Sequence, residues 1–172
     1  KLIGIVPFGL SNSEPVKTAQ VLKGVWPGIS QEDKVIIWGG GIWNWFDPLT
    51  LIKAMKLIYE KRQDVKLFFM GIGHPTENID ISTAEQCIAL SKEYGLYNKT
   101  IFFNDWVPYE ERQNYLLEAD IGISTYFNNL ETRFSFRTRI LDYLWCSLPM
   151  VLTRGDFMAD MVEREQLGLC HE

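Results

Sequence analysis

Short apolar runs alternate along the chain with amphipathic stretches, and this alternation constrains the fold more than any other feature. The runs are nearly continuously apolar, as strands covered on both faces of a parallel sheet are. They span residues 34–38, 65–70, 100–103, 120–124, 149–153 and 168–171. Strands that alternate with helices in this way predict a Rossmann-like α/β fold, a three-layer α/β/α sandwich with about six parallel strands.

The amphipathic stretches carry the signals of helix ends. Asp47 is placed to cap a helix that begins at Pro48, and apolar residues follow at three- and four-residue spacings. Ser82 and Glu85 form the pattern of a capping box, and Gly95 is expected to end the same helix. Three more helices are expected over residues 108–118, 137–146 and 156–165.

Three consecutive glycines, Gly39, Gly40 and Gly41, follow the first predicted strand. In an open parallel sheet, ligands bind beyond the carboxyl ends of the strands. Without side chains, Gly40 and Gly41 can bring backbone amides close to an anion, and the helix start at Asp47 adds a favourable dipole. A tight turn explains the same glycines equally well. The loop lacks the Gly-Lys-Ser/Thr of a P-loop and the GxGxxG spacing of a dinucleotide site.

Charged residues gather between the fourth and fifth predicted strands, in the segment ETRFSFRTRILDYLWCSLP. The segment supplies a first acid in a loop, guanidinium groups and exposed amides at a helix start, and a second acid one turn further on. Such groups suit hydroxyls and a phosphate. The candidate site residues are Glu131, Ser135, Phe136, Arg137, Arg139 and Asp142. A solvated, charged helix start is the alternative interpretation.

Two other loops offer residues that could contact a ligand. His74 follows the second predicted strand, although a lone loop histidine is often incidental. Trp106 follows the third strand and could stack on a base or a sugar, although core packing is the commoner role of aromatic residues. The sequence shows no Ser-His-Asp, Cys-His or metal-ligand spacing, so covalent hydrolase chemistry and a metal site are both poorly supported.

Composition excludes further classes of protein. The chain has 17 Lys and Arg against 22 Asp and Glu, and the resulting net charge of -5 argues against binding nucleic acid through its phosphates. Cys87, Cys146 and Cys170 form no CxxC pair, which favours a reducing compartment over a disulfide scaffold. No apolar run reaches the roughly 18 residues of a membrane span. A length of 172 residues beginning at Lys1 predicts one domain, residues 1–172, cut from a longer protein.

Five segments, taken in order, resemble a known family. They are IGIVPFG, VIIWGGGIWNWFDPLTLIKA, LFFMGIG, VPYEERQNYLLEADIGIS and ETRFSFRTRILDYLWCSLPMV. Together they resemble the C-terminal half of a GT-B glycosyltransferase. The likeness is strongest to the group 1 or family 4 enzymes, which use nucleotide sugars and retain the anomeric configuration.

The resemblance implies that the chain is the donor half of a hexosyl-type glycosyltransferase of polysaccharide biosynthesis. Its ligand would be a nucleotide-diphosphate sugar, with no metal and no other cofactor. A separate N-terminal domain of the same protein would bind the acceptor, such as a glycan or a lipid-linked sugar, so the chain alone is expected to transfer no sugar. The expected location is the cytoplasm, with peripheral membrane association at the inner face through the missing half.

The resemblance also implies a role for individual residues. Asp142 matches the second acid of the family's pair, which holds the ribose hydroxyls. Glu131 is matched to the first acid, the catalytic residue that contacts the donor sugar. The family's first acid usually lies eight residues before the second, whereas Glu131 lies eleven before Asp142 (142 − 131 = 11), so the match needs a longer loop. Trp106 and Val107 fall in the stretch whose backbone reads the base.

The glycine loop lacks the Arg and Lys that commonly bind the diphosphate in this family, and Arg137 and Arg139 are expected to compensate. Two alternatives stay open. One is a nucleotide-sugar epimerase of the same fold. The other is a non-catalytic nucleotide- or carbohydrate-binding module.

Overall fold

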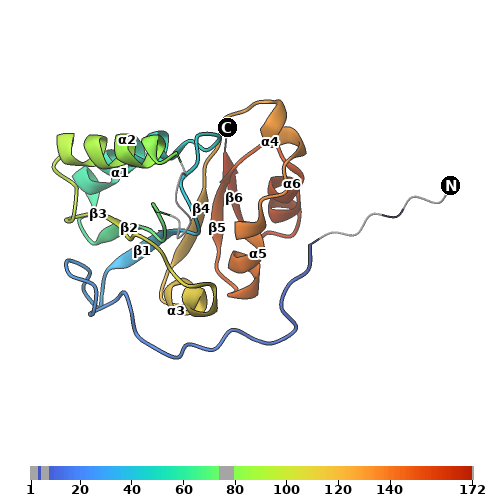
Figure 1. The fold of residues 1–172 in the computed structure, drawn as a ribbon, viewed down its shortest axis with the longest axis horizontal. Helices are drawn as coiled ribbons and strands as arrows, with labels where there is room; N and C mark the ends of the chain where they lie inside the picture. The colour runs from blue at the N-terminus through green and yellow to red at the C-terminus, as the bar shows by residue number, and fades with distance from the viewer. Residues whose placement is uncertain (1–3, 5–7, 74–79, 172) are drawn as a thin grey trace.

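The computed structural model describes residues 4, 8–73 and 80–171, and these form a parallel sheet of six strands (Figure 1). The strands are β1 Lys34–Trp38, β2 Val65–Phe69, β3 Ile101–Phe103, β4 Ile121–Ser124, β5 Met150–Thr153 and β6 Gly168–His171. Their order across the sheet is β3-β2-β1-β4-β5-β6, with every neighbouring pair parallel. The predicted Rossmann-like fold is confirmed, and each predicted strand agrees with an observed one to within one residue at each end.

Helices cover both faces of the sheet. They are α1 Pro48–Lys61, α2 Ser82–Glu93, the 3-10 turn η1 Tyr109–Glu111, α3 Arg112–Leu116, α4 Leu130–Phe134, α5 Thr138–Trp145 and α6 Phe157–Arg164. One face packs α1 and α2 against Ile36 and Trp38, and the other packs α3, α5 and α6 against Val35 and Ile37 (Figure 1). Alternate residues of β1 therefore enter two separate cores, which makes the sandwich three layers deep.

The predicted helix ends are confirmed in part. Asp47 Oδ1 accepts a hydrogen bond at 3.1 Å from an amide of the first turn of α1, as the cap pattern predicts. Gly95 follows α2 with a φ of 65°, a left-handed conformation that ends helices readily. The capping box is wrong, because α2 has Ile81 as its N-cap with no side-chain bond. The Ser82 amide donates instead to the carboxylate of Asp80.

Two helical segments differ from the sequence prediction. The helix expected over residues 108–118 consists of η1 followed by the five-residue α3. The sequence pattern does not predict α4, which is capped by Asn129. Its apolar side chains Leu130 and Phe134 are exposed, so no buried stripe marks this helix in the sequence.

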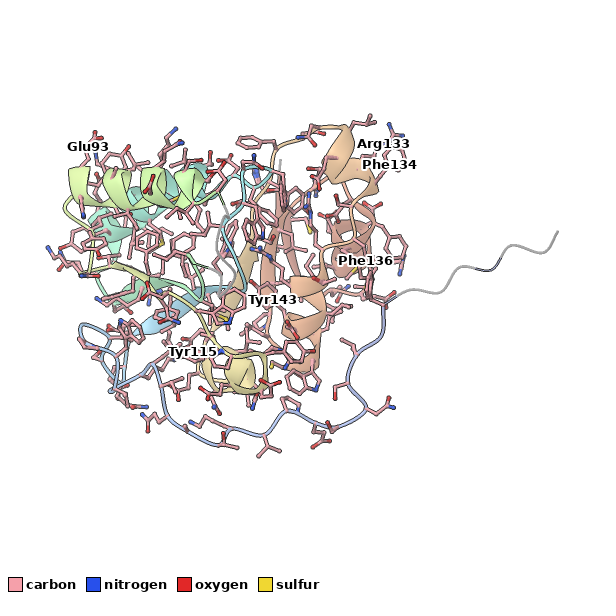
Figure 2. The ribbon with its side chains drawn as sticks, in the orientation of Figure 1. Glu93, Tyr115, Arg133, Phe134, Phe136 and Tyr143 are labelled. Atoms are coloured by element: carbon pink, nitrogen blue, oxygen red, sulfur yellow. The ribbon has the colours of Figure 1, made fainter. Side chains whose placement is uncertain are left out.

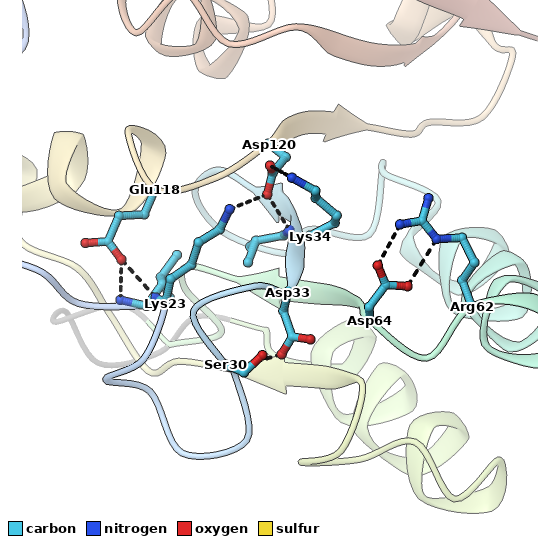
Figure 3. A network of polar contacts seen from close by, with 10 residues as sticks. Lys23, Ser30, Asp33, Lys34, Arg62, Asp64, Glu118 and Asp120 are labelled. Carbon is cyan, nitrogen blue, oxygen red and sulfur yellow. Dashed lines mark hydrogen bonds and ion pairs between the residues drawn. The ribbon is translucent and has the colours of Figure 1, made fainter.

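Residues 8–33 form a leading segment that passes beneath α3 before β1 begins (Figure 1). Two buried side chains fix it. Asn114 Oδ1 accepts hydrogen bonds from the amides of Thr18 and Ala19 at 2.8 and 3.2 Å. The Glu118 carboxylate accepts three more, at 2.8 to 3.0 Å, from the amides of Val21, Leu22 and Lys23. Figure 3 shows this carboxylate facing Lys23.

Tyr143 of α5 is fully buried and joins the two halves of the sheet (Figure 2). Its hydroxyl accepts a hydrogen bond from the Gly39 amide at 2.8 Å and donates to the carbonyl oxygen of Ile123 at 2.9 Å. A Cβ added to Gly122 would lie 2.7 Å from the Tyr143 ring, so glycine is required there. This contact fixes the end of β1 relative to β4, where the strand order reverses.

Candidate functional site

A cavity of about 150 Å³ opens at the carboxyl ends of β1 and β2, next to the reversal of strand order between β1 and β4. Its walls come from the loops after the first three strands, from α3 and from α5. They include Gly40, Gly71, Trp106, Val107, Arg112 and Asp142. The structure thus brings four of the predicted residues, Gly40, Trp106, Val107 and Asp142, to one cavity. Doubly wound sheets bind their ligands at this position.

The glycine turn presents backbone to the cavity through Gly39 and Gly40. Gly40 has a φ of 81°, which other residues adopt at a cost. A Cβ on Gly41 would lie 2.8 Å from the Trp43 ring, so the next position also requires glycine. The turn therefore lets a ligand approach the main chain with no side chain in between.

Arg139 reaches this turn from α5. Its Nη2 donates to the Gly41 carbonyl at 2.9 Å, and its guanidinium lies 4.6 and 4.1 Å from the rings of Trp38 and Phe46. Burial lowers the pKa of Arg139 to about 10, which still leaves the side chain charged at neutral pH. Its Nη1 is buried without a hydrogen-bond partner among the residues that the structure describes. One donor beside the glycine turn is therefore unused.

The loops after β2 and β3 are fixed to each other. The amides of Ile72 and Gly73 both donate to the carbonyl of Asp105, at 3.2 and 3.0 Å. The Asn104 side-chain amide donates to the carbonyls of Met70 and Trp106, both at 3.1 Å. These hydrogen bonds thus hold Trp106 and Val107 at the cavity wall.

Asp142 lies on α5 with a side chain that is 33% exposed and lines the cavity. Arg112 Nε donates to Asp142 Oδ1 at 2.9 Å. No other hydrogen bond or ion pair to this carboxylate comes from residues 8–73 or 80–171. The second oxygen therefore remains available to a ligand.

Glu131, Ser135 and Arg137 form a second cluster, at α4. Arg137 is buried and donates from Nη1 and Nη2 to the two Glu131 oxygens, at 3.1 and 2.7 Å. The Ser135 hydroxyl donates to the same carboxylate. Burial acts to raise the pKa of Glu131, but the hydrogen bonds from Arg137 and Ser135 outweigh it and lower the pKa. Glu131 is thus an ionised acid whose charge is matched by one arginine.

Phe46 lies between the two groups of residues. The guanidinium carbons of Arg137 and Arg139 lie 5.0 and 4.1 Å from its ring centroid. Phe136 contacts the leading segment, with its ring 5.5 Å from that of Phe8 (Figure 2). The remaining predicted site residue, His74, lies outside the described residues.

Sequence reasoning missed two residues of the site. Arg112 follows a 3-10 turn that is too short to show a periodic pattern. Tyr143 reads as one more apolar residue of α5, although its hydroxyl fixes the glycine turn. An aromatic hydroxyl in an otherwise apolar helix face is the one signal that points to it.

No three His, Cys, Asp or Glu side chains within residues 8–73 and 80–171 lie close enough together to hold a metal ion. In the same part of the chain, no helix has the length and apolar character needed to cross a membrane.

Comparison with known proteins identifies relatives of the chain. A family model described as glycosyl transferases group 1 matches residues 32–172. No curated protein matches the sequence. Solved structures do match, and one is WaaG, a glycosyltransferase involved in lipopolysaccharide biosynthesis, with a TM-score of 0.64 and 16% identity over 83% of this chain.

Two other structures are similar. The C-terminal domain of the group 1 glycosyl transferase LpcC from Francisella tularensis has a TM-score of 0.57 and 18% identity, covering 71% of this chain and 58% of that one. HepE from Anabaena, solved in complex with UDP and glucose, has a TM-score of 0.61 and 14% identity, covering 76% and 32%. The chain matches only 34% of the length of WaaG, about a third of that protein.

Proposed function

The chain belongs to the group 1 glycosyl transferases, and we propose that it is the donor-binding half of such an enzyme, with a nucleotide-diphosphate sugar as its ligand. The observation that carries the proposal is the cavity at the strand reversal, because its wall joins an acid, a bare glycine turn and an aromatic loop. The acid suits a ribose, the glycine turn suits a phosphate, and the aromatic loop suits a base. Family membership favours transfer over the epimerase alternative.

We assign the base and ribose to the cavity itself. Trp106 and Val107 form the wall for the base, and Gly71 lies beside the Trp106 ring, 3.5 Å from it at the position of an added Cβ. The free oxygen of Asp142 accepts hydrogen bonds from ribose hydroxyls. The UDP bound by HepE, a structure similar to this chain, makes a nucleoside diphosphate a reasonable first ligand to test.

The diphosphate is assigned to the glycine turn and the start of α5. This helix begins at Thr138 with no side-chain cap, so its first amides and its dipole favour an anion. The buried guanidinium of Arg139, whose Nη2 lies 3.9 Å from the position of a Cβ added to Gly40, adds a positive charge behind the turn. Arg137 is already paired with Glu131, so we assign it to the acid and not to the phosphate.

The donor sugar is assigned to the side of Glu131. The residue eight positions before Asp142, where the family usually has its first acid, is Phe134 (142 − 8 = 134). Glu131 lies three positions before Phe134 on α4, and residues so spaced share one face of a helix. A carboxylate one turn earlier can thus reach the same side of the site. An oxocarbenium-like centre would gain from its negative charge.

A calorimetric titration tests this proposal. The chain is titrated with UDP, GDP, ADP and dTDP, with and without EDTA, after a thermal-shift screen of the matching nucleotide sugars. We expect binding of at least one diphosphate that EDTA does not change, since arginines and amides supply the positive charge. No binding of any of them would overturn the proposed function. Loss of binding with EDTA would overturn the metal-free site alone.

A second assay addresses activity. We expect the chain to transfer no sugar from these donors to an added glycan, because we assign the acceptor to a separate N-terminal domain. Turnover by the purified fragment would show that this chain contains an acceptor site of its own.

A further inference from the structure

Arg112, the first residue of α3, is the most constrained charged side chain at the cavity, with only 13% of it exposed. Its Nε donates to Asp142 Oδ1 at 2.9 Å, and its Nη1 donates to the carbonyl of Tyr109 at 2.7 Å. Its guanidinium carbon lies 3.6 Å from the ring centroid of Tyr109 and 4.5 Å from that of Trp145. Aromatic rings from η1 and α5 thus hold the group in place.

Such fixation matters because a flexible surface ion pair orients nothing. Holding an exposed ion pair in one geometry costs the conformational entropy of two long side chains, so the pair contributes little to stability. A planar guanidinium that is stacked on aromatic rings and bonded to a fixed carbonyl has already lost that freedom. The Arg112 Nε–H therefore points in one direction, and the carboxylate that accepts from it is held in one orientation.

The charge of the pair matters as well. A carboxylate beside a bound diphosphate would repel it if no cation lay close by. Arg112 lines the same cavity as Asp142 and offsets its charge, while leaving the second carboxylate oxygen without a partner among the described residues. The pair can thus present an acceptor to a hydroxyl without repelling the phosphate.

We propose that Arg112 is the positioning residue of the donor site, which orients Asp142 so that its free oxygen selects a ribose over a 2′-deoxyribose. This inference rests on the proposed function. It assigns Arg112 no contact with the reacting atoms. A purely structural role, in which Arg112 only ties α3 to α5, would change stability without changing the preference between the two sugars.

The experiment compares ribonucleotides with their 2′-deoxy counterparts. Wild type, Arg112→Met, Arg112→Lys, Asp142→Asn and the Arg112→Met/Asp142→Asn double variant are titrated with UDP and 2′-deoxy-UDP, and with the GDP and ADP pairs. Arg62→Met is the matched control, because Arg62 pairs with Asp64 at the amino end of β2, whereas the cavity lies at the carboxyl end, and both side chains are exposed. Thermal melting of each variant reports stability separately.

We expect Arg112→Met to lower ribonucleotide affinity by about tenfold and to remove most of the preference over the deoxyribonucleotide. Arg112→Lys should recover part of the preference, because an ammonium restores the charge but not the stacked geometry. The double variant should lose no more than Asp142→Asn alone, since both changes remove the same contact. Arg62→Met should bind like wild type.

The outcomes separate the two claims. If wild type binds nucleoside diphosphates and Arg112→Met keeps the ribose preference, the positioning role is wrong and the proposed function stands. If the losses of Arg112→Met and Asp142→Asn add in the double variant, the two residues act independently and the inference also fails. If wild type binds none of the nucleotides, the proposed function fails and this inference falls with it.

Discussion

Carboxylates at the two edges of the sheet are held in different ways. At the amino-terminal edge, Asp33, Glu118 and Asp120 each accept at least one backbone amide, and lysine side chains complete their surroundings (Figure 3). At the carboxyl edge, Glu131 and Asp142 are held by the side chains of Arg137 and Arg112. No described backbone amide donates to either of these two carboxylates.

The difference separates acids that close the fold from acids that we assign to a ligand. A backbone amide that donates to a buried carboxylate cannot leave without unfolding the segment that carries it, so those acids are committed to stability. Asp142 accepts one bond from Arg112 and keeps its second oxygen for another partner, whereas both oxygens of Glu131 accept from Arg137. The same residue types thus serve different purposes at opposite ends of the same strands.

The largest expected effect is on stability, at the amino-terminal edge. Glu118→Ala leaves the amides of Val21, Leu22 and Lys23 without their acceptor and should lower the free energy of unfolding by about 3 kcal/mol or more. Urea denaturation measures this loss. Exposed Glu60 on α1 provides the control, because Glu60→Ala should change stability by less than about 0.5 kcal/mol. Should Glu118→Ala fail to fold, Glu118→Gln must still be less stable than the control. Equal stability would contradict the role of Glu118 as the acceptor that fixes the leading segment.

Next in size is an effect on binding at the carboxyl edge. Asp142→Ala should weaken binding of both nucleoside diphosphates and nucleotide sugars by about ten- to a hundredfold, because it removes a charged acceptor of the ribose. Stability should fall by less than about 1 kcal/mol, because the Asp142 side chain is 33% exposed and Arg112 keeps its bond to the Tyr109 carbonyl when the carboxylate is removed. Asp64→Ala, which breaks the exposed pair with Arg62, is the binding control. A large loss of stability with unchanged affinity would place Asp142 among the structural acids.

A smaller and more selective effect is expected at Glu131. Glu131→Gln keeps hydrogen-bonding atoms near Arg137 but removes the charge, so it should weaken nucleotide sugars by about three- to tenfold. The bare nucleoside diphosphate should bind as tightly as before. Calorimetry with both ligands measures the difference. Equal losses for the two ligands would remove the assignment of this acid to the sugar.

The smallest effect concerns pH. Burial acts to raise the pKa of Asp120, but hydrogen bonds from Lys23, the Val35 amide and Lys34 outweigh it and lower the pKa. The stabilisation is therefore complete above the unfolded pKa of about 3.9 and is lost as pH falls through the lower folded value.

Between pH 5 and pH 2, the free energy of unfolding should accordingly fall by about 1 kcal/mol more for wild type than for Asp120→Asn. This figure is reduced for solvent screening. Parallel pH profiles for the free energies of unfolding of the two proteins would contradict this account of Asp120.

The sequence predicts the sheet well because its strands are buried on both faces, and such runs are readable without tertiary information. Runs such as KVIIW and VKLFF appear as β1 and β2. The prediction fails where local structure depends on exposed residues or on distant partners. One turn of α4 with Leu130 and Phe134 exposed has no periodic signal, and Ile81 replaces the expected Ser82 cap.

The site follows the same rule. Loop positions after the strands predict that Gly40, Trp106, Val107 and Asp142 share the carboxyl edge, and they line one cavity. The partners of the charged residues could not be predicted, because they depend on which side chains the fold brings together. Arg112, thirty residues before Asp142, donates to the Asp142 carboxylate, and Arg137 pairs with Glu131.

Hydrogen–deuterium exchange with and without a nucleoside diphosphate tests the division between the two edges most directly. The protein is exchanged alone and with saturating UDP, GDP or ADP, and peptides across residues 8–73 and 80–171 are compared. We predict slower exchange around Gly40, Trp106 and Asp142 with at least one nucleotide. Exchange in the leading segment, residues 8–33, should not change, except at Phe8, whose ring contacts Phe136. Protection confined to residues 18–33, or no protection with any nucleotide, would contradict the assignment of the site to the carboxyl edge.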